Sequence, residues 1–213
     1  MGVDMEPIRR FAQGRLSGAR ASHDWDHTCR VYNLCMHIGG TEGADMEVLK
    51  IAAYLHDIGR PWQDRSQGKT CHAQKGADMA RSFLGTYPLS REEKKNIIHC
   101  IRSHRFRGNT PPQTLEAKVL FDSDKLDAIG AIGVARTFQF AGEVGATLHN
   151  PSVNPAHTRP YTREDTGYRE FKLKLSRIKD RMLTREGRRM AEERHAFMAQ
   201  FFERFLQEHE AMK

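Results

Sequence analysis

Apolar side chains recur three and four residues apart along most of the chain, and this spacing constrains the fold more than any other feature of the sequence. It predicts amphipathic helices, because positions three and four apart share one helix face. The chain has no sustained alternation of β-branched and polar residues and no Asn-Gly hairpin turn. Nothing in the sequence therefore predicts a sheet, and we expect an all-α protein.

The local signals place the ends of several helices. Ser90 and Glu93 form a capping box, and Gly39-Gly40 is expected to end an early helix. Residues 60–70 are expected to form a polar loop, and 142–166, rich in Gly, Pro, Asn and Thr, are the longest irregular segment. The predicted helices span 5–17, 24–39, 44–58, 71–85, 91–103, 113–127, 128–141, 166–182 and 184–210.

The length of 213 residues favours one domain. We predict a single domain over 1–213, a helical bundle with its core at about 20–140. The loop 142–166 and the helices of 166–210 form a C-terminal helical extension. His149, His157 and Arg159 lie in that loop, which either closes over a site as a lid or is an ordinary surface loop.

Composition excludes several classes of protein. No apolar run is long enough to span a membrane, and the N-terminus lacks an apolar signal core, so a cytoplasmic location is expected. The four cysteines form no C-x-x-C pair, which argues against a zinc ribbon or a redox motif. The net charge of +7 is spread along the chain with interspersed acids. An anionic small molecule is therefore a more plausible partner than nucleic acid.

One apolar run ends in a titratable pair. Val48–Leu55 reads as a buried helix, and His56-Asp57 follows it, with Ile58 and Gly59 next. A histidine at a helix C-terminus can simply stabilise the helix dipole while the aspartate is exposed. Alternatively, both side chains bind one metal ion near the helix end, since a buried carboxylate needs a cation or hydrogen-bond donors.

Two other predicted helices supply partners for this pair. His27 lies near the start of 24–39. Either His23 and Asp24 orient the His27 side chain, or Ser22 or Asp24 caps the helix. Asp122, Asp124 and Asp127 interrupt an otherwise apolar helix. A set of one His, one His-Asp and one Asp suits a divalent ion such as Mn²⁺, Mg²⁺, Fe²⁺, Co²⁺, Ni²⁺ or Zn²⁺.

The order H…HD…D, with H-x-x-R-V at His27 and D-x-L-D-A-x-G-A at Asp124, resembles the HD-domain metal-dependent phosphohydrolases. More narrowly, it is similar to the small single-domain bacterial branch that includes nucleotide pyrophosphohydrolases. The resemblance implies that His27, His56, Asp57 and Asp124 are the metal ligands. Asp122 is the alternative to Asp124 as the last ligand. The resemblance extends through I-R-S-H-R (101–105), G-A-I-G-V-A-R-T-F (130–138), H-T-R-P-Y (157–161), F-K-L-K-L (171–175) and M-L-T-R-E-G-R-R-M-A (182–191).

The same resemblance assigns further roles. Asp57 is expected to hold the attacking water or accept its proton. His72 and His104 are expected to take part in catalysis, and in dinuclear members histidines at comparable points bind a second metal. In mononuclear members they lie beside the phosphate. The alternative for both is a helix-cap or surface histidine. The expected substrate-binding residues are Arg30, Lys75 and Arg105.

The implied activity is hydrolysis of a (deoxy)nucleoside triphosphate to monophosphate and pyrophosphate, with manganese or another divalent ion as cofactor. The alternatives are a nucleoside monophosphate phosphatase, another phosphodiesterase, or a non-catalytic nucleotide-binding module. The aromatic face of the last helix would fit a homodimer.

Overall fold

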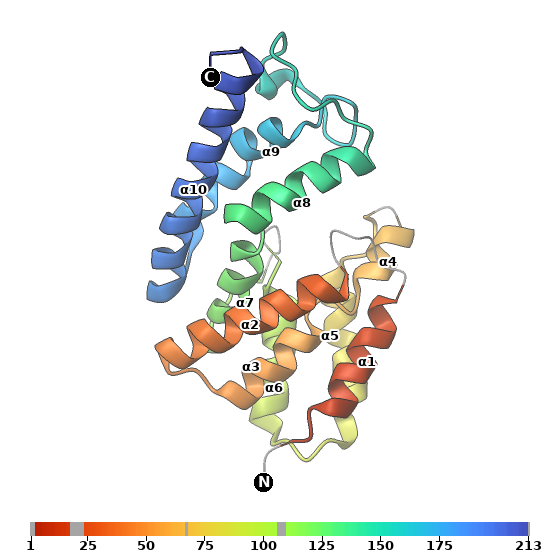
Figure 1. Ribbon diagram of the computed structural model, residues 1–213. Helices are drawn as coiled ribbons and strands as arrows, with labels where there is room; N and C mark the ends of the chain where they lie inside the picture. Colours follow the sequence, from red (N-terminus) through yellow and green to blue (C-terminus); the bar gives the residue numbers. More distant parts are fainter. Residues whose placement is uncertain (1–2, 18–23, 67, 106–109, 213) are drawn as a thin grey trace. The chain divides into compact units, whose positions relative to one another are not determined.

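The computed structural model describes residues 3–17, 24–66, 68–105 and 110–212. These residues form helices and connecting segments with no strand, which confirms the all-α prediction (Figure 1). Within the same residues, no helix combines the length and apolar character needed to cross a membrane. The chain divides into two compact units, an N-terminal unit (Met1–Asp124) and a C-terminal unit (Lys125–Lys213). That the two units belong to one domain over 1–213 stays a prediction.

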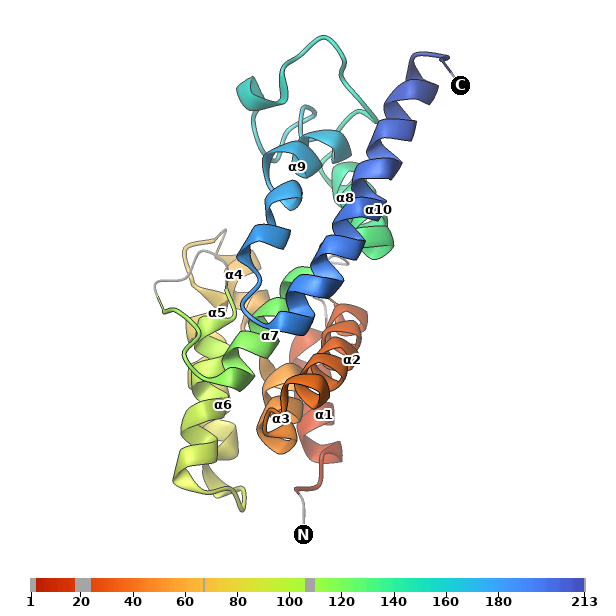
Figure 2. The same cartoon turned by 90° about the vertical axis from the view of Figure 1, so that its left-hand side faces the viewer.

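The N-terminal unit contains α1 to α6 and most of α7. Helix α2 packs against α3, α3 packs against α6, and α5 lies beside α6 (Figures 1 and 2). Its core is built from fully buried aliphatic side chains such as Ile38, Leu49, Ile51 and Ile101. The helices are α1 (Glu6–Leu16), α2 (Trp25–Glu42), α3 (Met46–Leu55), α4 (Arg60–Arg65), α5 (His72–Phe83), α6 (Arg91–Ser103) and α7 (Leu115–Leu126).

Helix α2 does not end at Gly39-Gly40, and that prediction was wrong. It continues to Glu42 and ends at Gly43, which has a left-handed φ of 78°. A Cβ on Gly39 would lie 2.4 Å from Cδ2 of Leu49 on α3. Gly39 therefore serves the close crossing of α2 and α3, and this packing offsets the cost of about 1 kcal/mol for a helical glycine.

Two other boundaries also differ from the prediction. The expected loop 60–70 contains α4, which begins with Pro61 in its first turn, where proline is tolerated. The expected helix 166–182 is only α9 (Gly167–Leu173), followed by the 3₁₀ turns Leu175–Arg177 and Lys179–Arg181. No Gly or Pro marks the end of α9, so its early end has no local sequence signal. The capping box of Ser90 and Glu93 is confirmed.

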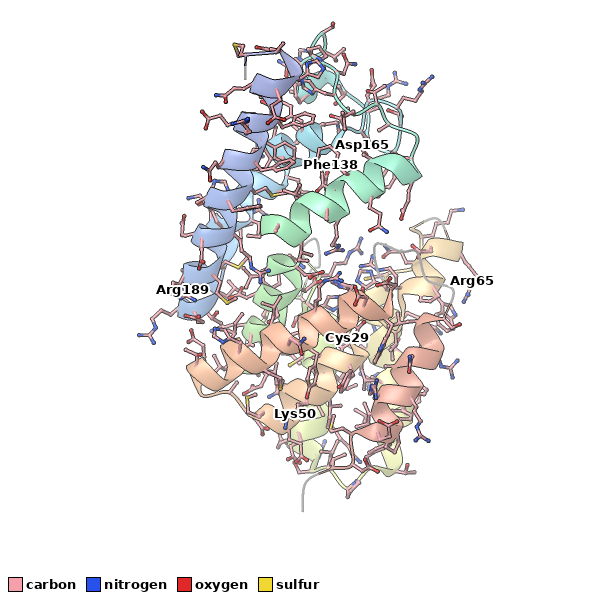
Figure 3. The ribbon with its side chains drawn as sticks, in the orientation of Figure 1. Cys29, Lys50, Arg65, Phe138, Asp165 and Arg189 are labelled. Atoms are coloured by element: carbon pink, nitrogen blue, oxygen red, sulfur yellow. The ribbon has the colours of Figure 1, made fainter. Side chains whose placement is uncertain are left out.

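The C-terminal unit packs α8 (Gly130–Glu143) against α9 and α10 (Arg185–His209). Phe138 on α8, labelled in Figure 3, has its ring centroid 5.7–6.1 Å from those of three phenylalanines of α10. These phenylalanines are Phe201, Phe202 and Phe205. Aromatic contacts of this kind supply much of the core of the unit.

Two buried carboxylates of the C-terminal unit have counterions from the same unit. Arg136 donates to Asp127 at 2.7 Å, and Arg169 donates to Asp165 at 2.6 Å. Asp165, labelled in Figure 3, also accepts a hydrogen bond from the backbone N–H of Tyr161 at 2.7 Å. The second pair thus ties the irregular segment before α9 to the helix. That this segment forms a lid stays a prediction.

Candidate metal centre

The first turn of α2 positions His27. Asp24 caps the helix by accepting a hydrogen bond from the backbone N–H of His27 at 3.0 Å. Asp24 is thus one of the two predicted caps, and the other, Ser22, lies outside the described residues. Because the cap fixes the first turn, the His27 side chain is held in the buried interior, where it is 1% exposed.

The turn after α3 positions His56 and Asp57. Both are fully buried, and the alternative of an exposed Asp57 is excluded. A Cβ on Gly59 would lie 2.2 Å from the backbone oxygen of His72 and 2.7 Å from the backbone nitrogen of Gly76. Only glycine allows this approach. It brings the start of α5, and with it His72, against the turn that carries Asp57.

A first group of possible ligands combines His27, His56 and Asp124 from three helical segments. Their ligand atoms all lie within 4.8 Å of one another. Nε2 of His27 is 3.4 Å from Oδ1 of Asp124 and 3.8 Å from Oδ2 of Asp57. Nε2 of His56 is 3.9 Å from the same Asp57 oxygen.

A second group combines Asp57, His72 and His104. Oδ1 of Asp57 lies 3.4 Å from Nε2 of His72 and 3.5 Å from Nε2 of His104. The two histidine Nε2 atoms are 3.1 Å apart. The Asp57 carboxylate therefore lies between the groups, with Oδ2 facing one and Oδ1 facing the other.

Burial keeps two of these imidazoles neutral. Desolvation lowers the pKa of His56 to about 4, although the Asp57 charge opposes the shift. Desolvation likewise lowers the pKa of His72 to about 2. Neutral imidazole is the form that binds metal ions. His56 donates from Nδ1 to the carbonyl of Ala53 at 2.7 Å, which leaves the Nε2 lone pair directed at the first group.

The residues present fit a divalent ion. His56 Nε2 is buried and makes no hydrogen bond with any residue that the structure describes, an arrangement that costs free energy unless another partner is supplied. Carboxylate oxygens and neutral imidazole nitrogens form a hard and borderline donor set. Among the described residues, the first group of possible ligands includes the half-buried Asp124 and not Asp122, although Asp122 is fully buried.

The three predicted substrate-binding residues have other contacts in the structure. Arg30 forms an ion pair with Asp26. The Lys75 ammonium lies 5.6 Å from the centroid of Trp62, and Arg105 lies 3.4 Å from the sulfur of Cys71. Their roles in substrate binding stay predictions.

Two residues near the groups were missed. The Arg60 guanidinium lies 3.4 Å from Oδ2 of Asp57, and Oε1 of Gln63 lies 2.8 Å from Nδ1 of His72. The three-residue spacing from Asp57 to Arg60 is a helical spacing that could have indicated the first contact. No sequence pattern indicated the contact of Gln63 with His72, because Gln63 lies in the segment 60–70 that was expected to be a loop.

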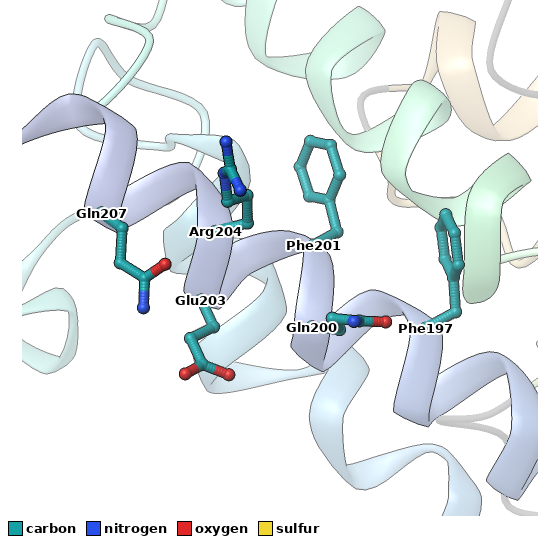
Figure 4. Close-up of a pocket in the computed structure, with 6 residues that line it drawn as sticks. All are labelled: Phe197, Gln200, Phe201, Glu203, Arg204 and Gln207. Atoms are coloured by element: carbon teal, nitrogen blue, oxygen red, sulfur yellow. The ribbon is translucent and has the colours of Figure 1, made fainter. Parts of the chain in front are cut away.

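A hollow in the C-terminal unit has a different character. Its lining comes entirely from α10, with Phe197 and Phe201 beside polar side chains (Figure 4). Only one of its residues, Glu203, carries a carboxylate, and none is a histidine or cysteine. The hollow therefore lacks a metal-ligand set. The homodimer expected from the aromatic face of this helix stays a prediction.

Comparison with known proteins identifies the family. The model of the HD domain matches residues 24–129. The uncharacterized protein YpgQ of Bacillus subtilis is 36% identical over 200 residues, which cover 92% of this chain and 89% of YpgQ. The chain belongs to the HD-domain superfamily. It is a metal-dependent phosphohydrolase, which confirms the coarse prediction of its activity and of a divalent metal cofactor.

Two solved structures extend this likeness over most of the chain. An HD-superfamily hydrolase from Bacillus thuringiensis has a TM-score of 0.76 and 30% identity, with 97% of each chain covered. The crystal structure of Bacillus subtilis YpgQ in complex with ADP has a TM-score of 0.71 and 33% identity, with 95% of this chain and 93% of that chain covered. The HD-domain likeness thus extends beyond the residues that the family model matches.

Proposed function

We propose that this HD-domain protein hydrolyses nucleoside triphosphates, with deoxynucleotides as the favoured class, to the monophosphate and pyrophosphate. The observation that carries the proposal is the buried Asp57 carboxylate, which lies within 4 Å of four imidazole nitrogens. The similar YpgQ has been crystallised in complex with ADP, which supports a nucleotide as the ligand. The spread of positive charge supports an anionic substrate.

We assign the metal to His27, His56, Asp57 and Asp124. When bound there, a divalent ion supplies a Lewis acid that polarises the phosphate and makes water more acidic. Asp57 holds the attacking water by a hydrogen bond or accepts its proton. The water oxygen forms a bond to the α-phosphorus, the bond from that phosphorus to the α,β-bridging oxygen breaks, and pyrophosphate leaves.

Positive side chains hold the phosphates in this scheme. Arg30, Lys75 and Arg105 are the predicted set, and we add Arg60 because its guanidinium already lies beside Asp57. Phosphoryl transfer depends mainly on positioning and on charge stabilisation of the phosphoryl oxygens. His72 and His104 complete the site on the other side of the Asp57 carboxylate.

The test is hydrolysis of deoxy- and ribonucleoside triphosphates in ¹⁸O-labelled water with Mn²⁺ present. Attack at the α-phosphorus places the label in the monophosphate, whereas attack at the β-phosphorus places it in pyrophosphate. Asp57→Ala is expected to lower kcat/KM by about 10³-fold or more. Asp78→Ala, an exposed carboxylate on α5, is the matched control and should retain activity.

Other products would contradict the proposal. Orthophosphate released from nucleoside monophosphates would indicate a phosphomonoesterase. Cleavage of polynucleotides in place of triphosphates would indicate a phosphodiesterase. Metal and nucleotide binding without turnover would indicate a binding module.

A further inference from the structure

The imidazole of His72 is oriented by a side chain, whereas those of His56 and His104 are oriented by backbone carbonyls. Nδ1 of His56 and Nδ1 of His104 donate to the backbone carbonyls of Ala53 and Ile101, at 2.7 and 2.6 Å. Nδ1 of His72 instead contacts Oε1 of Gln63, a side chain on α4, at 2.8 Å. A backbone carbonyl cannot be replaced by substitution, but a glutamine can.

The orientation of the Gln63 amide is set by a second contact. The backbone N–H of His72 donates to the same Oε1 atom at 3.4 Å. A backbone N–H can only donate, so the atom that faces His72 is the oxygen and not the amide nitrogen. Nδ1 of His72 is therefore the protonated nitrogen, and its Nε2 carries the lone pair.

The lone pairs of two rings then face a carboxylate oxygen. Nε2 of His72, Nε2 of His104 and Oδ1 of Asp57 are separated by 3.1, 3.4 and 3.5 Å. All three are acceptors. A phosphate oxygen is also an acceptor and would be repelled by this set, whereas a cation would be attracted.

We propose that Gln63 is a positioning residue that holds His72 in its metal-binding tautomer and thereby makes the group Asp57, His72 and His104 a site for a cation. The inference rests on the phosphohydrolase function proposed above and adds a residue of α4 to it. Without the Gln63 oxygen, His72 can place its proton on Nε2 and donate to Nε2 of His104, 3.1 Å away. That hydrogen bond would occupy both nitrogens and exclude the cation.

Two variants of Gln63 separate this role from packing. Gln63→Met removes the acceptor and keeps a long unbranched side chain, whereas Gln63→Glu keeps an acceptor oxygen. Gln74→Met, on the exposed face of α5, is the matched control, because the Gln74 amide donates to the exposed Asp78 carboxylate of the same helix. Each full-length variant is prepared metal-free, and its folding is checked by circular dichroism.

The first readout is the tautomer of His72 in ¹⁵N-labelled protein, read from two-bond ¹H–¹⁵N spectra and assigned with His72→Gln. The wild type, Gln63→Glu and Gln74→Met should have the proton on Nδ1, and Gln63→Met should have it on Nε2. The second readout is calorimetric titration with Mn²⁺ alone. Gln63→Met should weaken one binding step by about 10- to 100-fold, and Gln63→Glu should restore it.

Three results would overturn the assignment: an Nδ1 proton on His72 in Gln63→Met, wild-type Mn²⁺ binding in that variant, or equal losses in the Met and Glu variants. The last would mean that Gln63 acts through packing. Failure of the proposed function would look different. The tautomer and Mn²⁺ differences would persist while no variant, nor the wild type, released pyrophosphate from any nucleotide.

Discussion

The two units of the chain treat buried carboxylates in opposite ways. In the C-terminal unit, Asp127 and Asp165 are 1% and 3% exposed, and each meets an arginine at hydrogen-bonding distance. In the N-terminal unit, Asp57 is 1% exposed, and its oxygens face imidazole nitrogens at 3.4–3.9 Å. Its guanidinium neighbour, Arg60, is 3.4 Å away, a longer contact than in either C-terminal pair.

This difference distinguishes carboxylates that stabilise the fold from a carboxylate that is suited to binding a metal ion. A buried charge is costly unless it is paired, and the C-terminal unit supplies the pairing from its own side chains. The N-terminal unit surrounds the Asp57 carboxylate with imidazole nitrogens that suit a cation from outside the chain, and Arg60 adds a longer ion pair from within the unit. We expect the first arrangement to stabilise the fold at all times and the second to do so mainly when metal is bound.

Among the single substitutions, the largest effect on stability should follow from removing one member of a C-terminal pair. Asp165→Asn leaves Arg169 buried beside a neutral amide, and we expect a loss of about 3–5 kcal/mol in the free energy of unfolding. Urea denaturation measures it. Glu170→Gln, whose partner Lys174 is half-exposed, should change the free energy by less than about 1 kcal/mol. Equal losses for the two substitutions would contradict the claim that the buried Asp165–Arg169 pair stabilises the fold more than an exposed pair.

Metal should stabilise the wild type through the N-terminal unit. At a free Mn²⁺ concentration of about 100 times Kd, binding adds about 2.7 kcal/mol to the free energy of unfolding. Thermal denaturation with and without a chelator measures this gain. Asp57→Asn should abolish it, while Asp165→Asn should retain it. A gain that survives Asp57→Asn would place the metal elsewhere.

The metal-free protein should lose stability in acid because of its buried imidazoles. The pKa values of His56 and His72 lie below the usual 6.5, so below pH 6.5 the unfolded chain binds protons that the folded chain does not. The free energy of unfolding should fall by up to about 1.4 kcal/mol per pH unit for each ring, between pH 6.5 and about 4. Denaturation across this range should give a shallower slope for His72→Gln and an unchanged one for the exposed His37→Gln. A stability that rises in acid would contradict the shifts.

The smallest effect is expected for Asp57→Asn without metal. This substitution removes a buried charge from a site built for a cation, so the metal-free variant should unfold within about 1 kcal/mol of the wild type or be more stable. Urea denaturation in the presence of chelator measures this difference. A loss as large as that of Asp165→Asn would show that the ion pair of Asp57 with Arg60 stabilises the fold as strongly as the C-terminal pair does.

The sequence predicted those parts of the fold that depend on local interactions. The capping box at Ser90 fixes the start of α6 within one turn, so the local sequence was sufficient to predict where this helix begins. The end of α2 was missed because Gly39 is selected by a contact with Leu49 on another helix. Such a contact has no local signature.

The candidate site divides in the same way. The ordered histidines and aspartates were visible in the sequence, and the structure brings His27, His56, Asp57, His72, His104 and Asp124 together in two groups. The contact of Gln63 with His72 could not be predicted, because it depends on α4 forming in a segment whose sequence is typical of a polar loop. The sequence carries the chemistry of the ligands, whereas the residues that orient them depend on tertiary structure.

The bare backbone at Gly59 has a consequence for ion size. Main-chain atoms of His72 and Gly76 lie against it, so the spacing between the turn after α3 and the start of α5 is fixed by main chain. Unlike side chains, these atoms cannot separate by changing rotamer. We therefore expect Asp57 and His72, whose backbones are held at this spacing, to favour ions with short bonds, such as Mg²⁺ at about 2.1 Å, over Ca²⁺, which takes more ligands at about 2.3–2.6 Å. A residue without a functional group would thus contribute to ionic selectivity.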